Sequence, residues 1–151
     1  MNSDATISYN LAELLVEQSP DAIVFADSNG IIRVWNNSAE RIFGFKARDA
    51  LGANLNIIIP ERFRDAHWRG YERALADRAT KYAGQILSTR AIRSDGSRIY
   101  VELSFAIVLD EKGGALGALA HARDITKSFE KERADQKRLR ELEKKLDGRA
   151  R

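Results

Sequence analysis

The chain has 151 residues, of which 44% are hydrophobic and 31% charged, and its formal net charge is +3. This length suits one domain with an appendage, and it provides enough apolar side chains for one core. Because the sequence contains no cysteine, it excludes disulfides, thiolate metal sites, cysteine nucleophiles and a flavin–cysteinyl adduct. No apolar run approaches the roughly 20 residues that span a bilayer, and "MNSDATISYN" has no signal-peptide features. We therefore expect a cytoplasmic protein that does not enter a membrane.

The positive charge is concentrated at the C-terminal end. Residues 127–151 contain ten Lys/Arg against six Asp/Glu, whereas residues 1–126 contain fifteen against sixteen. A basic tail can contact nucleic acid, but acidic residues are interspersed here, which is typical of a solvated helix. The tail also resembles no DNA-reading module. We therefore expect no nucleic-acid partner.

The N-terminal region predicts a helix followed by a hairpin. Residues 9–18 place Leu11, Leu14 and Leu15 at helical spacing, which predicts a short amphipathic helix. The segment "DAIVFADSNGIIRVWN" contains two apolar runs on either side of an Asn-Gly pair. Since Asn-Gly is a strong hairpin signal, we expect two antiparallel strands, with Trp35 as a core residue at the end of the second.

Three helical segments are expected next. "NSAERIFGF" predicts a short helix that its polar start can cap and Gly44 can end. "KARDALG" predicts a further turn that Gly52 closes. Residues 60–79 begin with a proline, which the first position of a helix tolerates, and they predict the longest of the three helices.

His67 lies on this long helix, four residues after Phe63 and four before Tyr71, on the stripe that a helix turns toward a core. From its position alone it can be a packed core residue, a metal ligand, a catalytic base or a cofactor ligand. As a base it would need a nucleophile in reach, and the sequence offers none above chance. There is also no phosphate-binding glycine loop, G-x-S-x-G or kinase catalytic loop, so we expect no enzyme. We expect the adjacent Trp68 to cover the outer face of the helix.

The segment from Gly84 to Thr126 is typical of three strands, which "SDGS" and "DEKGG" separate. One face of the second strand is apolar and consists of Val101, Leu103, Phe105 and Ile107. The third strand alternates between two faces, with Ala118, Ala120 and Ala122 on one and Leu119, His121 and Arg123 on the other. We expect His121 to point away from the alanines, toward a packing surface or a second subunit.

The C-terminal segment predicts a charged helix without a breaker. Leu139, Leu142 and Leu146 are spaced three and four residues apart, as in the seam of a coiled coil. Glu132 and Asp135 occupy the preceding seam positions. Only the last turns of this helix therefore present an apolar seam.

The order of these segments, with "GF" closing the first short helix, "DGS" at a hairpin and "RDIT" ending the last strand, resembles the PAS sensor fold over residues 10–126. The resemblance implies an α+β fold: a five-stranded antiparallel sheet with helices on one face, flanked by an N-terminal amphipathic helix and a C-terminal coiled-coil-like helix. It implies a cap helix at 1–19, a sensor domain at 20–126 and a signalling helix at 127–151. Asp124 and Thr126 can cap that last helix through their side-chain oxygens and form a hinge.

One PAS subfamily is excluded by its own motif. The light-oxygen-voltage photoreceptors carry G-x-N-C before the long helix, whereas this chain has "GANL", so Leu55 replaces the cysteine that attacks flavin. Val101 and Ala122 stand where those photoreceptors use an asparagine and a glutamine on the flavin ring. We therefore expect no flavin photochemistry.

The segment "IPERFRDAH" resembles the heme-binding oxygen- and redox-sensing PAS domains, in which P-x-x-x-R-x-x-H opens the long helix and the histidine coordinates iron. Pro60, Arg64 and His67 match that spacing. The resemblance implies heme b with His67 as the metal ligand, and a neutral imidazole suits iron. Gly70 would give the flat macrocycle room to approach. The cofactor-binding residues so implied are His67, Gly70, Gln85, Leu87, Val101, Leu103, Phe105, Ile107, Ala120 and Ala122.

Two positions depart from that subfamily. In the oxygen-sensing relatives an arginine or a methionine on the first strand after the helix contacts or ligates the iron, and here Leu87 and Gln85 occupy those positions. A distal methionine ligand is therefore missing, while Gln85 can donate a hydrogen bond to bound oxygen. Three interpretations of the interior stay open: a heme pocket, an empty or small-ligand pocket, and a packed interior.

The resemblance implies a sensor of a diatomic gas or of redox state, in which a change at the iron shifts the strands and alters the angle or pairing of the C-terminal helix. Because the chain ends soon after that helix, we expect output to pass to a separate signalling protein. The alternative is a heme-free PAS module that binds a small organic ligand or acts as a dimerisation unit. We expect a homodimer, joined mainly through residues 9–18 and the outer sheet face around Leu119 and His121, with the basic C-terminal helices running side by side.

Overall fold

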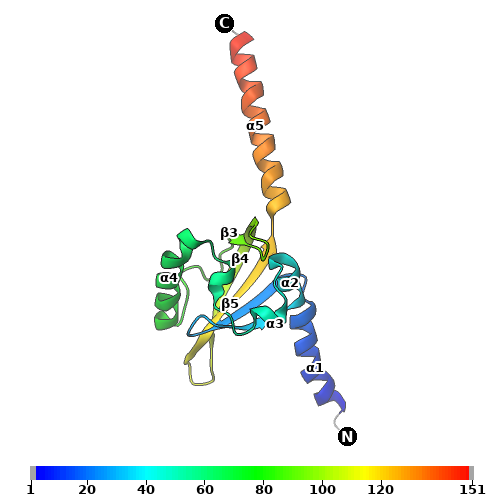
Figure 1. The fold of residues 1–151 in the computed structure, drawn as a ribbon, viewed down its shortest axis with the longest axis vertical. Coiled ribbons are helices and arrows are strands. Elements are labelled where there is room, and N and C mark those ends of the chain that lie inside the picture. The colour runs from blue at the N-terminus through cyan, green and yellow to red at the C-terminus, as the bar shows by residue number, and fades with distance from the viewer. Residues whose placement is uncertain (1–2, 150–151) are drawn as a thin grey trace.

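The computed structural model describes residues 3–149, with side chains from residue 10 onward. Five strands form one antiparallel sheet in the order β2-β1-β5-β4-β3 (Figure 1). The strands are β1 (Ala22–Asp27), β2 (Ile32–Trp35), β3 (Leu87–Ile92), β4 (Arg98–Leu109) and β5 (Ala115–Asp124). Two strands precede the central helices and three follow them, so the predicted α+β arrangement is confirmed.

The helical elements differ from the prediction mainly at their ends. They are α1 (Ser3–Gln18), α2 (Asn37–Phe43), α3 (Ala47–Ala50), the 3-10 turns η1 (Leu55–Ile58) and η2 (Glu61–Phe63), α4 (Arg64–Asp77) and α5 (Thr126–Arg149). The first helix is longer than the predicted 9–18. A single helix over 60–79 is wrong: Pro60 has an extended ψ of 137°, and a tight turn separates it from α4. Arg78 ends α4 in a left-handed conformation with φ 57°.

The strand register sorts the side chains onto two faces. Phe105 of β4 lies opposite Ala120 of β5, which in turn lies opposite Val24 of β1. Because side chains alternate along a strand, the predicted apolar wall and the alanine row share one face, which we call the inner face. His121 pairs with Ser104 on the other, outer face, as predicted.

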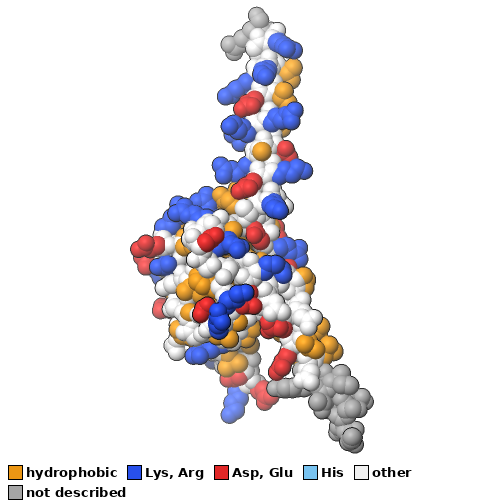
Figure 2. All heavy atoms as spheres, turned by 45° about the vertical axis from the view of Figure 1, so that its right-hand side comes forward, with side chains coloured by type: hydrophobic (Ala, Val, Ile, Leu, Met, Phe, Trp, Pro, Cys, Tyr) orange, Lys and Arg blue, Asp and Glu red, His pale blue; other side chains and the backbone are white. Residues whose placement is uncertain are grey.

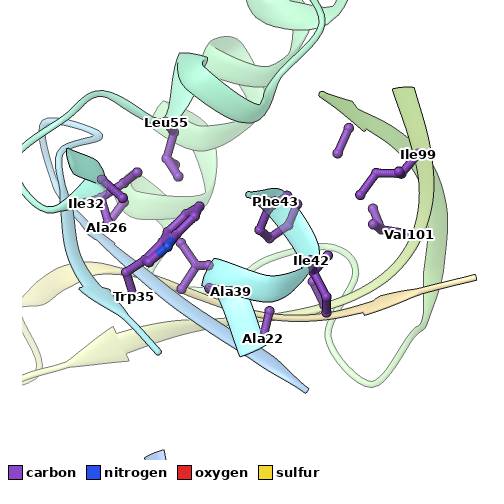
Figure 3. Close-up of a cluster of buried hydrophobic side chains, with 14 of the residues drawn as sticks. Ala22, Ala26, Ile32, Trp35, Ala39, Ile42, Phe43, Leu55, Ile99 and Val101 are labelled. Atoms are coloured by element: carbon purple, nitrogen blue, oxygen red, sulfur yellow. The ribbon is translucent and has the colours of Figure 1, made fainter. Parts of the chain in front are cut away.

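The core lies between the inner face and α2 (Figure 3). Ile42 and Phe43 of α2 are buried against Trp35, whose ring centroid is 5.4 Å from that of Phe43. Trp35 also donates its indole N–H to the carbonyl of Phe45 at 3.0 Å. The prediction of Trp35 as a core residue at a strand end is confirmed. Gly44 ends α2 with φ 82°, a value that favours glycine, as predicted for this cap.

Asn36 connects four segments at the edge of this core. Its Oδ1 accepts hydrogen bonds from the N–H groups of Ile23 and Ala39, at 2.9 and 3.0 Å. Its Nδ2 donates to the carbonyls of Val16 and Asp21, at 2.8 and 3.1 Å. The side chain is 1% exposed. One buried amide therefore ties the end of α1 to β1, β2 and the start of α2.

The two terminal helices extend away from the body in opposite directions (Figure 1). Helix α1 packs mainly against α2 and exposes Leu11, Leu14 and Leu15. Apolar side chains of the outer face are only half-buried and include Ile23, Phe25, Val34, Val108 and Leu119. Between residues 3 and 149, no helix combines the length and the apolar character needed to cross a membrane.

Candidate functional site

Helix α4 is held at its entry by the arginine of the sequence motif. Arg64 donates from Nε to the carbonyl of Ile59 at 3.0 Å and from an Nη atom to the carbonyl of Asn56 at 3.2 Å. Pro60 is buried just before η2. Two residues of the motif therefore shape the loop that leads into α4, and the third, His67, stands on the helix itself.

The His67 side chain is half-buried on the side of α4 that packs against the body. Its ring centroid is 4.7 Å from that of Trp68 and 5.7 Å from that of Tyr71. Its Nδ1 is buried and has no hydrogen-bond partner among the described residues. Buried polar atoms are nearly always paired, so this atom requires an explanation. Burial lowers the pKa of His67 below its ordinary value, which keeps the imidazole neutral near pH 7 and able to ligate a metal.

Trp68 packs inward, so the prediction that it covers the outer face of α4 is wrong. Its indole ring lies against Gly30 in the β1–β2 hairpin, where an added Cβ would come within 2.2 Å of the ring. The indole N–H donates to Oδ1 of Asn56 at 2.8 Å. The sequence did not reveal this contact, because the space for the indole ring exists only where Gly30, which is distant in the sequence, meets α4.

Tyr71 attaches α4 to the end of β1. Its hydroxyl lies 2.6 Å from the carbonyl oxygen of Asp27 and 3.0 Å from that of Ala26, and it donates its proton to these acceptors. Burial, the largest cause, raises the pKa of Tyr71 to about 12. The tyrosine four residues after His67 therefore fixes the helix that carries the histidine.

We expect Tyr71→Phe to lower the free energy of unfolding by about 1 kcal/mol, because it removes the hydrogen bond by which the buried hydroxyl joins α4 to the end of β1. Tyr82→Phe is the matched control, since Tyr82 is half-buried in the segment after α4. Urea unfolding followed by circular dichroism measures both. Equal stability of the two variants would contradict the role of the Tyr71 hydroxyl.

Part of the inner face is apolar but only half-buried. This inner strip consists of Leu87, Leu103, Phe105, Ile107, Ala118 and Ala120. Two other predicted lining residues on the same face, Val101 and Ala122, are buried in the core. Leu103 and Ala118 pack against the same core as Trp68 and Leu75 of α4. The inner strip and the helix that carries His67 therefore meet at one edge of the core.

Two predicted lining residues lie away from the inner strip. Gln85 is exposed, because the chain enters β3 only at Leu87. The structure therefore does not bring Gln85 to the strip, where it was expected to reach a bound ligand. Gly70 is exposed on α4, and no atom lies within 4 Å of the position that a Cβ would take. The space beside Gly70 is thus open.

Tyr100 fastens α5 to the sheet. Its N–H donates to Oγ1 of Thr126 at 3.0 Å, and its carbonyl accepts from the N–H of Ile125 at 2.9 Å. Its ring stacks on Phe129 with centroids 3.8 Å apart. Asp124 accepts from the N–H of Thr126 at 2.9 Å, as predicted for the helix start. The Thr126 hydroxyl donates to Asp124 at 2.6 Å and accepts from the N–H of Tyr100, so it links these two residues instead of capping the helix. Both β4 neighbours of Tyr100 point to the inner face, so this residue links the strand that lines that face to the first turn of α5.

A five-stranded sheet in this order, with short helices and one longer helix over its inner face, defines the fold. The family model described as "PAS fold" matches residues 10–125. The chain belongs to the PAS family. The resemblance inferred from the sequence is thereby confirmed, and the match includes the sheet, α4 and the inner strip but ends before α5.

Two relatives of this PAS domain are named as sensors. It is 32% identical over 129 residues to the sensor protein FixL of Bradyrhizobium diazoefficiens. This alignment covers 84% of this chain and 24% of FixL. It is 25% identical over 111 residues to the oxygen sensor protein DosP of Escherichia coli K12. That alignment covers 74% of this chain and 14% of DosP. The chain is a sensory PAS domain and spans less than a quarter of the length of either relative.

Solved structures share the fold. A PAS domain from Colwellia psychrerythraea superposes with a TM-score of 0.69 at 25% identity, covering 80% of this chain and 98% of that one. An RNA-binding light-oxygen-voltage receptor superposes with a TM-score of 0.68 at 20% identity, covering 92% of this chain and 38% of the receptor. The similarity to this receptor extends to the fold alone.

Proposed function

We propose that this PAS domain holds heme b through His67 and senses a diatomic gas or redox state. The observation that carries the proposal is the buried Nδ1 of His67, which lacks a partner among the described residues, on a neutral imidazole close to a half-exposed apolar strip. A bound heme would supply an iron centre that binds a diatomic gas or changes its oxidation state. The similarity to a protein named an oxygen sensor supports this proposal.

The residues around His67 have separate roles in the proposed site. His67 would hold the iron through an imidazole nitrogen, and the side chains of Leu103, Phe105 and Ile107 would offer an apolar surface that excludes water from the cofactor. The alanines of β5 leave room where larger side chains would fill the space. Trp68 and Tyr71 hold α4 in place, so the position of the histidine is set before any cofactor binds.

The absorbance spectrum of the purified protein tests the heme proposal. After expression with added heme precursor, we expect a Soret band at about 400 nm that survives dialysis. His67→Ala should remove the band or release the heme on dialysis, because the apolar strip alone offers no iron–nitrogen bond. His121→Ala is the matched control, since His121 lies on the outer face and should leave the spectrum unchanged. Absence of the band in the unmodified protein, or its full retention in His67→Ala, contradicts the proposal.

A heme-free module is the second candidate, and the inner strip is the observation that favours it. An apolar surface that the helices leave half-exposed would also suit a small organic ligand. In that case the same spectrum shows no Soret band, while the fold and its dimer contacts are unaffected.

We also propose that the domain is a homodimer without catalysis of its own. The exposed leucines of α1 and the half-buried outer face, including Leu119, are two apolar surfaces that a second copy can cover. Signal would leave through α5, because Tyr100 connects the inner face to the first turn of that helix. A separate signalling protein would receive it.

A further inference from the structure

We infer that α5 pairs in parallel with α5 of a second copy, with the leucine-bearing half of each helix in contact and the half next to the body held apart. The inference rests on the proposed homodimer and does not depend on heme. It follows from the exposure, the phase and the charge pattern of residues 126–149.

Helix α5 has no partner within its own chain beyond its first turns. It rises from the body as a single helix (Figure 1), and none of its residues is buried. Leu139, Leu142 and Leu146 are 57%, 49% and 65% exposed. Figure 2 shows apolar side chains along one side of this helix, between charged ones. A row of exposed leucines on an otherwise charged helix indicates a surface that another helix covers.

The phase of α5 turns this row away from the body. The seam consists of Ser128, Glu132, Asp135, Leu139, Leu142 and Leu146, at alternating spacings of four and three. Phe129 is stacked on Tyr100 and so defines the side of the helix that faces its own sheet. At about 100° per residue, the seam is centred roughly a quarter turn from Phe129. The seam is therefore free to meet a second helix while the contact with Tyr100 remains in place.

The charges beside the leucines favour the parallel orientation. In a parallel pair the residue just before Leu139 occupies a g position, which faces the e position five residues later on the other helix. Arg138 of one copy would thus face Glu143 of the other, twice by symmetry. In an antiparallel pair Arg138 would face Lys145, which has the same charge. A second copy in parallel is therefore the partner whose charges complement this helix.

The half of the seam next to the body opposes pairing. In a parallel dimer Glu132 would meet Glu132 of the other copy, and Asp135 would meet Asp135, so two successive layers carry like charges. Lys131 and Arg138 flank these layers and offset only part of the repulsion. Three leucine layers form a short contact that is weak in isolation, so it depends on the bodies holding the helices close together. The pair therefore opens most easily beside the sensor domain.

Electron spin distance measurements on the full chain test this arrangement. The sequence has no cysteine, so single spin labels can be placed at Glu130→Cys and Lys144→Cys, which occupy equivalent outer positions in the two halves. We expect a short, narrow distance at 144 and a longer, broader one at 130. Glu132→Leu with Asp135→Leu should shorten and narrow the distance at 130, and it should tighten the dimer roughly tenfold in sedimentation.

Each other outcome overturns the inference in a recognisable way. A distance at 130 as short and narrow as that at 144 would show that the two halves of α5 pair equally well. A distance at 130 that the double leucine variant leaves unchanged would indicate antiparallel pairing. A dimer in sedimentation without spin coupling at 144 leaves the homodimer intact but frees α5 for a different partner. A monomer at tens of micromolar contradicts the homodimer as well, while the Soret band of the same sample reports on heme separately.

Discussion

Replacing Asn36 with alanine is expected to lower the free energy of unfolding by about 3 kcal/mol, a large part of the stability of a domain of this size. The amide makes four hydrogen bonds in a position that water does not reach, two as acceptor and two as donor. Alanine would leave two N–H groups and two carbonyls without these partners, and each unpaired buried group is unfavourable. It would also remove the N-cap of α2.

Urea unfolding followed by circular dichroism measures this loss. Asn37→Ala is the matched control, because Asn37 is the next residue, is exposed and begins the same helix. We expect the control to change the free energy of unfolding by less than about 0.5 kcal/mol. Since Asn36 also binds the carbonyl of Val16, amide exchange near the end of α1 should accelerate in Asn36→Ala. Comparable stability of the two variants would show that the buried amide is not needed.

Gly30→Ala is expected to be the second strongly destabilising change, by about 3 kcal/mol. Two costs combine at this position. The backbone has φ 77°, where alanine is strained by about 1–2 kcal/mol. The new methyl group would also lie 2.2 and 2.4 Å from two carbons of the Trp68 ring, so the indole must move and its bond to Asn56 is disturbed.

Two comparisons separate these costs. Gly52 has a similar φ of 85°, but no neighbouring atom lies within 4 Å of an added Cβ. Gly52→Ala therefore reports the backbone strain alone, about 1–2 kcal/mol. In a Trp68→Ala background, Gly30→Ala should cost no more than Gly52→Ala, because the ring it would meet is gone. If Gly30→Ala is as mild as Gly52→Ala in the unmodified protein, the contact between the hairpin and α4 does not restrain the helix.

In the proposed site, heme binding would depend on how rigidly α4 is held. Trp68 and Tyr71 attach the helix to the β1–β2 hairpin, the first at Gly30 in the turn and the second at the end of β1. The imidazole of His67 packs against both of their rings, and the three ring centroids form a triangle with sides of 4.7, 5.7 and 5.2 Å. A variant such as Tyr71→Phe would therefore loosen the proposed ligand without touching it, which separates positioning of the histidine from the iron bond itself.

The elements of this fold could be read from local patterns. The Asn-Gly hairpin, the cap of α2 at Gly44 and the alternation along β4 and β5 all depend on residues close in the sequence. Such patterns are strong because neighbouring residues alone satisfy the geometry of a turn, a cap or a pleat. Helix ends do not follow from such patterns: a tight turn precedes α4 where the proline predicted the helix start, because Pro60 has an extended backbone.

The sequence by itself determined the PAS fold, the face on which His121 lies and the spacing that singles out His67, because periodicity and motif spacing are local properties. Only the tertiary structure decided how α4 is held, since the Gly30–Trp68 contact and the Tyr71 hydrogen bonds join segments that are distant in the chain. It also moved Gln85 off the inner strip and left Nδ1 of His67 buried without a partner among the described residues. Burial and pairing depend on every segment that packs around a side chain, so no local pattern could reveal them.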